Sequence, residues 1–184
     1  MAEKKYKGRR AYLNDFKKDE KGNYEYQGDL YYWAGEKDAL RKELMILWIL
    51  CSAMVALIIT AGCVEAPGSM NSFYVVLPYT ISFVCGVTTA WGMWRLFEGG
   101  NPLRAYNYKA SVEQIPVRSI GIMICAGAAA LGEIVFLFRS RFENHVGKSI
   151  LFVLLEVAAV LFAAILRKKV MKMPWEKKSK IDKS

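Results

Sequence analysis

The sequence has little of the material from which common catalytic and metal sites are built. It contains one histidine, His145, and its four cysteines form no CxxC pair and no Cys/His spacing typical of metal ligands. A P-loop, a Gly-rich dinucleotide turn, an HExxH motif and a nucleophile elbow are all missing. We therefore expect no metal, no cofactor and no catalytic residue of these classes. The cysteines lie inside apolar runs and are expected to act as small packing residues.

The apolar stretches lack the polar stripes that helices of a soluble bundle carry. Apolar residues make up 54% of the chain and are concentrated in four blocks, at residues 44–64, 73–97, 117–138 and 150–166. A helix needs about 20 residues to cross the hydrocarbon core of a bilayer. The sequence predicts an all-α membrane protein with four transmembrane helices in an antiparallel up-down bundle. This transmembrane domain is expected to cover residues 36–166, with residues 36–43 continuing into the first span.

Positive charge is almost absent from one side of these four blocks. Of the 26 Lys and Arg residues, eleven precede residue 44, eight lie from residue 167 onward and four surround the second connection. Only Arg139, Arg141 and Lys148 fall in the third connection, and the first has none. Cytoplasmic termini would place 23 of the 26 inside, as the positive-inside rule favours. We expect an integral protein of a plasma (cytoplasmic-type) membrane with both termini cytoplasmic.

The two tails differ in composition. Residues 1–35 are basic and aromatic, and short alternating patterns at 11–16 and 23–27 favour a β-hairpin around a turn at 17–22. A disordered basic tail is the alternative, because an isolated hairpin is marginally stable in water. Residues 31–33 (Tyr-Tyr-Trp) are expected at headgroup level. Residues 167–184 form a polybasic tail. Both tails are expected to contact anionic lipid headgroups rather than nucleic acid, since they flank the spans on the side that faces acidic lipid.

Glu133 and Glu156 each interrupt an apolar span. A charged side chain at the centre of a span costs about 2.5–3.5 kcal/mol on insertion scales, so intramembrane carboxyls are rarely accidental. With ~1.5 Å of rise per residue, both lie roughly 8–10 Å below the outer ends of their helices. Each also shares a helix face with small residues, which mark close helix contacts in lipid. We therefore expect the two carboxyls to face each other, directly or through one bridging group.

Two interpretations of this glutamate pair remain open. Two carboxyls in one apolar site do not readily both ionise, so the pair can form a proton or cation site. The alternative is a structural polar contact between helices, or an ion pair with Arg139 or Arg141. Tyr79, Thr80 and Thr88 of the second span are candidates for a polar lining beside the glutamates. Hydroxyl groups in spans commonly bond their own backbone instead.

A third candidate group, Arg95, Glu98 and Arg118, is expected to form a charged cluster at the inner interface. This cluster is the basis for one possible function, a membrane enzyme that acts at the inner interface. It is the least supported of three functions. The first is a non-enzymatic subunit or scaffold of a membrane complex, and the second is a small proton- or cation-coupled transporter that uses the glutamate pair. The expected partners are the bilayer, its anionic headgroups, and either further copies of the chain or another membrane protein.

Overall fold

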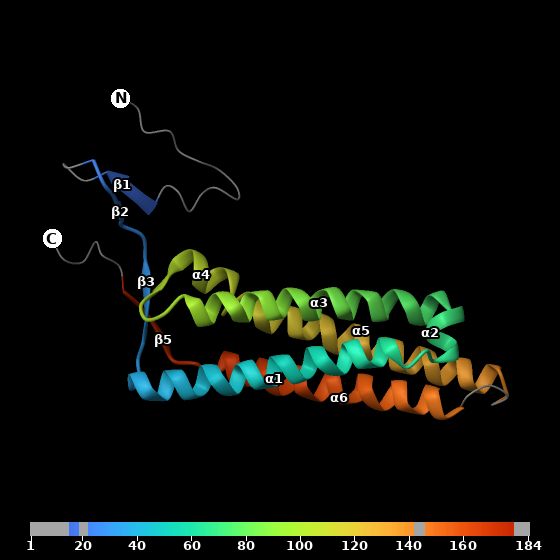
Figure 1. Cartoon of the computed structure of the whole chain (residues 1–184). Coiled ribbons are helices and arrows are strands. Elements are labelled where there is room, and N and C mark those ends of the chain that lie inside the picture. Colours follow the sequence, from blue (N-terminus) through green and yellow to red (C-terminus); the bar gives the residue numbers. More distant parts are fainter. Residues whose placement is uncertain (1–14, 19–21, 142–145, 179–184) are drawn as a thin grey trace.

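Four long helices dominate the computed structural model, which describes residues 15–18, 22–141 and 146–178 (Figure 1). They are α1 (Lys37–Cys63), α3 (Phe73–Glu98), α5 (Gln114–Arg139) and α6 (Val146–Met171). Each is long and apolar enough to cross a membrane, which confirms the expected number, length and composition of the helices. Helix α1 begins at Lys37, so the charged segment before the first apolar block does continue into it. His145 lies outside the described residues.

The long helices lie side by side, and the connections between successive helices alternate between the two ends of the bundle (Figure 1). Helix α5 packs against α3 and α6, and α1 packs against the same two helices. A short helix, α2 (Pro67–Asn71), connects α1 to α3 at one end, which we call the α2 end. The opposite end carries the strands and a second short helix, α4 (Ala105–Ala110), and we call it the sheet end.

The sheet end holds a three-stranded antiparallel sheet that the sequence did not predict. Its strand order is β4 (Leu103–Arg104), β3 (Leu30–Trp33), β5 (Trp175–Lys178). The register pairs Leu30 with both Arg104 and Lys178. The sheet therefore joins three segments that are far apart in the sequence: the one before α1, the one between α3 and α5, and the one after α6. The two tails therefore pair with each other, and the N-terminal tail also pairs with the connection between α3 and α5.

The aromatic residues of β3 explain why the sheet forms. Tyr31 stacks on Tyr108 of α4, and Trp33 meets Trp175 of β5 edge to face. Their expected position at headgroup level stays a prediction. These rings pack against the main apolar core, and the Leu103 side chain of β4 is fully buried in that core. The gain from burying large aromatic surface thus offsets the entropy lost on ordering the tails.

A separate two-stranded hairpin precedes β3. Strands β1 (Phe16–Lys18) and β2 (Tyr24–Tyr26) pair antiparallel, with Phe16 opposite Tyr26. The predicted hairpin is therefore present, but Lys17 and Lys18 belong to its first strand and not to its turn. Residues 11–14, which we expected in the first strand, lie outside the described residues.

Buried apolar side chains fill the bundle from the sheet end to its middle. The main cluster includes Leu47, Met54, Met93, Ile122 and Leu166. A smaller cluster at the α2 end combines Ala61, Ala66, Val75, Ala129 and Phe152. Both glutamates are buried within the bundle, so what surrounds their carboxyls decides which role they can have.

Candidate functional site

The Glu133 carboxylate is fully buried and joins three segments of the chain. Its Oε1 accepts a hydrogen bond from the Ser149 hydroxyl of α6 at 2.6 Å and another from the Gly68 backbone N–H at 3.1 Å. Its other oxygen has no hydrogen-bond partner among the described residues. One oxygen of a side chain on α5 thus connects α5 to α6 and α2.

The bond to Gly68 gives Glu133 a capping role. Helix α2 starts at Pro67, and its N-cap residue Ala66 has no side chain that can accept the first backbone N–H groups. Unpaired N–H groups at a buried helix start are costly, and an acceptor from elsewhere in the chain can satisfy them. Glu133 supplies that acceptor from α5. A Cβ atom at position 68 would collide with Glu133 Oε2, so only glycine allows this approach.

Glu156 has a different environment. It is fully buried on α6, and neither carboxylate oxygen has a hydrogen-bond partner among the described residues. Ala159 and Ala163, the next buried positions of α6, are also fully buried. The phenol of Tyr79 on α3 interacts with Glu156 electrostatically, while its hydroxyl donates to the Ile58 carbonyl at 3.0 Å.

The structure places the two glutamates on adjacent helices and inside the bundle, but at different heights. Ser149, which bonds Glu133, lies seven residues before Glu156 on α6, and at ~1.5 Å per residue this separates the two levels by roughly 10 Å. No hydrogen bond joins the carboxyls within the described part of the chain. Arg139 and Arg141 are exposed and bond neither glutamate. The interior therefore contains two separate carboxyl sites. Glu133 is hydrogen-bonded, whereas Glu156 has no hydrogen-bond partner among the described residues.

The predicted lining residues divide between the interior and the surface. Tyr79 is half-buried and faces Phe152, with 5.9 Å between the ring centroids. Thr80 and Thr88 are exposed, and their hydroxyls donate to the carbonyls of Val76 and Val84 one turn earlier. Of the three, Tyr79 is the one with an electrostatic interaction with Glu156.

No hydrogen bond or ion pair joins Arg95, Glu98 and Arg118 to one another among the described residues. Arg118 of α5 donates to the Thr88 carbonyl of α3. Arg95 turns toward Tyr106, donating to its hydroxyl at 3.3 Å, and Glu98 is exposed.

Sequence reasoning missed Gly68 and Ser149, the two residues that hold Glu133. Pro67 and Gly68 lie in the short connection between the first two apolar blocks, and Ser149 lies just before the fourth block. A proline followed by a glycine is also compatible with the first positions of a helix, and that signal was available. No protein-family model matches the chain, and neither curated proteins nor solved structures show significant similarity to it, so the function rests on this geometry alone.

Proposed function

We propose that the chain is an integral membrane protein in which the four long helices form an antiparallel four-span bundle with both termini in the cytoplasm. Large apolar side chains cover the outer surfaces of all four helices, among them Ile49, Val84, Leu131 and Leu161. Such continuous apolar surface is expected to face lipid. The 23 positive charges outside the third connection support the same orientation.

We propose further that the protein acts as a non-enzymatic subunit or scaffold of a membrane complex. The observation that carries this proposal is the sheet end. There, strands from three separate segments form one ordered surface, braced by the Tyr31–Tyr108 and Trp33–Trp175 ring contacts. An ordered surface favours binding because less conformational entropy is lost when a partner docks.

The interior of the bundle also favours a scaffold over a carrier. Between Glu156 and the sheet end, the buried positions of α6 are Ala159, Ala163, Leu166 and Val170. The buried positions of α3 and α5 toward that end include the apolar Met93, Leu96 and Ile115. They also include the hydroxyl residues Ser82, Thr89 and Ser119, each of which donates to a backbone carbonyl of its own helix. A polar route from the carboxyls to the sheet end would require a second packing of these side chains.

Assembly is tested by the native size of the protein extracted from its own membranes in mild detergent. We expect a complex larger than the chain purified alone. Reversing two exposed charges of β5, with Glu176→Lys and Lys178→Glu, should release the chain from that complex, whereas Glu156→Gln should not. If the native size is that of a single chain, the protein joins neither another protein nor further copies of itself, and the subunit proposal is wrong.

Glu156 supports a second candidate, a small proton- or cation-coupled transporter. Its fully buried carboxyl has no hydrogen-bond partner among the described residues, as a group that must exchange a proton requires. The test is proton flux into liposomes that contain the purified protein and an internal pH-sensitive dye. Transport through this site predicts flux that Glu156→Gln abolishes, and a scaffold predicts no flux from either protein.

A further inference from the structure

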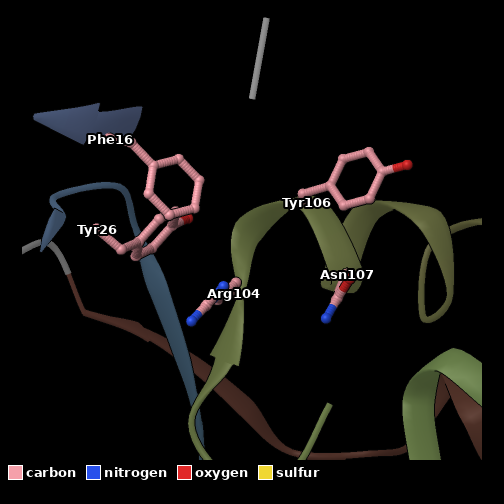
Figure 2. Close-up of a pocket in the computed structure, with 5 residues that line it drawn as sticks. All are labelled: Phe16, Tyr26, Arg104, Tyr106 and Asn107. Atoms are coloured by element: carbon pink, nitrogen blue, oxygen red, sulfur yellow. The ribbon is translucent and has the colours of Figure 1, made fainter. Parts of the chain in front are cut away.

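A small cavity at the sheet end lies between the hairpin and α4, apart from both glutamates. Its volume is about 120 Å³, and Phe16, Tyr26, Arg104, Tyr106 and Asn107 line it (Figure 2). In Figure 2 the rings of Phe16 and Tyr26 stand on one side and Tyr106 and Asn107 on the other, with Arg104 toward the centre below the rings. Pockets that enclose drug-sized ligands measure about 300–1,000 Å³, so this one accepts only a small chemical group.

The guanidinium of Arg104 is held by aromatic rings and not by a carboxylate. It lies 5.5 Å from the ring centroid of Tyr26 and 5.8 Å from that of Phe16. Arg104 is exposed and forms no ion pair within the described residues. A cation–π contact uses none of the five N–H donors of a guanidinium, so these remain available for a planar, two-pronged acceptor.

The backbone fixes the position of this arginine. Arg104 pairs with Leu30 in the sheet, and the next backbone N–H, of Ala105, donates to the Asp29 carbonyl at 3.1 Å and to the Tyr26 hydroxyl at 3.2 Å. The Tyr26 hydroxyl in turn donates to the Asp29 carbonyl at 3.1 Å. Because its hydroxyl is engaged with the backbone, the Tyr26 ring stays in place beside the guanidinium.

The charges around the cavity favour an anion. Arg95 of α3 lies 5.5 Å from the Tyr106 ring centroid and 5.8 Å from that of Trp91, and it forms no ion pair within the described residues. It places a second positive charge next to the pocket. Two acidic residues, Asp15 and Asp29, interact electrostatically with Tyr26. Lys177 neutralises Asp29 at 2.7 Å, and Asp15 forms no ion pair with Arg104. The local balance of charge is positive.

From this geometry we infer that the cavity binds a phosphate group. Arg104 supplies a bidentate pair of donors, and the Asn107 side-chain amide, which has no hydrogen-bond partner within the described residues, supplies another. The phosphate comes from an anionic lipid headgroup or from a soluble phosphate. Trp91 and Trp94, in the last turns of α3, are of the residue type that is enriched at headgroup level. The inference that the phosphate belongs to a lipid rests on the proposed membrane location. The inference that the pocket binds a phosphate does not depend on it.

The test measures ligand binding to the full chain in a neutral detergent. Three probes are compared: short-chain phosphatidic acid, short-chain phosphatidylcholine and inorganic phosphate. The variants are Arg104→Lys, which keeps the charge but loses the planar fork, and Asn107→Ala. Lys172→Gln is the control, because Lys172 is exposed and removing its charge alters the overall electrostatics without touching the pocket. Thermal melting of each variant verifies that it is folded.

We expect phosphatidic acid to bind more tightly than phosphatidylcholine, and Arg104→Lys to weaken it by about tenfold, as the loss of a charge-assisted bidentate contact implies. Lys172→Gln should change the affinity by less than about twofold, as expected of one exposed charge. Binding of phosphatidic acid alone identifies a lipid headgroup, and equal binding of inorganic phosphate identifies a soluble source. Equal weakening by Arg104→Lys and Lys172→Gln, or no binding of any probe to the wild type, would overturn the inference.

Discussion

The ring of Tyr31 lies flat on the ring of Tyr108, with 3.8 Å between their centroids and 3° between their planes. Tyr31 belongs to β3, which precedes the first long helix, and Tyr108 belongs to α4, in the connection after the second. Stacked aromatic pairs contribute about 0.5–1.5 kcal/mol beyond the area they bury. This contact therefore helps to couple the N-terminal segment to the middle of the chain.

A double-mutant cycle measures that coupling. We expect Tyr31→Leu and Tyr108→Leu each to lower the free energy of unfolding, and the double variant to lose less than the sum by about 0.5–1.5 kcal/mol. The measurement is denaturant unfolding in detergent, followed by tryptophan fluorescence, since Trp33 and Trp175 adjoin the pair. Strict additivity of the two single losses would mean that the stacked geometry contributes nothing.

Gly68→Ala should destabilise the α2 end. The added methyl group would occupy the position of Glu133 Oε2 and displace the carboxylate from the Gly68 N–H and the Ser149 hydroxyl. We expect a loss of about 1–3 kcal/mol, the usual cost of leaving a buried hydrogen-bonding group unsatisfied. The control is Gly127→Ala on α5, where a Cβ meets no atom within 4 Å. That variant should be neutral or stabilising by up to about 1 kcal/mol, because alanine favours helix. Equal stabilities of the two variants would contradict the capping role of Glu133.

The two glutamates should respond in opposite ways to loss of the carboxyl. Glu133→Ala leaves two buried donors unpaired and should cost about 1–3 kcal/mol for each. Glu156→Leu removes no hydrogen bond and replaces an unpartnered polar group with an apolar one of similar size, so stability should be unchanged or higher. Thermal melting in detergent compares them. A large loss of thermal stability in Glu156→Leu would contradict this prediction, because it would mean that the Glu156 carboxyl makes a stabilising interaction.

Alkaline pH should weaken the attachment of β5 to the segment before β3. The hydrogen bond and charge of Asp29 raise the pKa of the exposed Lys177 above its usual 10.5. The protonated lysine is thus favoured in the folded state, so its contribution is complete below 10.5 and is lost as pH rises through the raised pKa. Lys177→Met should be less sensitive in this range than Lys172→Met, with melting temperature followed from neutral to strongly alkaline pH. Identical slopes in the two variants would show that the Asp29 contact has no effect on stability.

Topology is accessible to labelling of single cysteines introduced into a cysteine-free variant. Sites in residues 65–72 and 139–149 should react with an impermeant reagent added outside sealed cells, because the positive charges favour cytoplasmic termini. Sites near Lys5 and Lys180 should react only after the cells are opened. Labelling of those terminal sites in intact cells would reverse the proposed orientation.

The long helices could be predicted from composition, because a run of about 20 apolar residues is a local signal. Burial of Glu133 and Glu156 followed from the small residues beside them. The partners of Glu133 could not be predicted, because the carboxylate reaches Gly68 across 65 positions of sequence. The sheet was missed for a similar reason. Strand β4 has two residues and β5 is mostly charged, so neither shows an alternating pattern, and both depend on β3 for their hydrogen bonds.

The placement of β3 at the centre of its sheet sets an order of events during synthesis. The central strand leaves the ribosome before any of the four long helices, whereas β5 is made after all of them. During most of translation, Tyr31 and Trp33 therefore lack Trp175 and the backbone partners of β5. An unpaired aromatic strand is a site at which a nascent chain associates with others. The sheet is complete only when the last long helix has been made and β5 has paired with β3. A chain truncated before Trp175 would keep one edge of β3 unpaired.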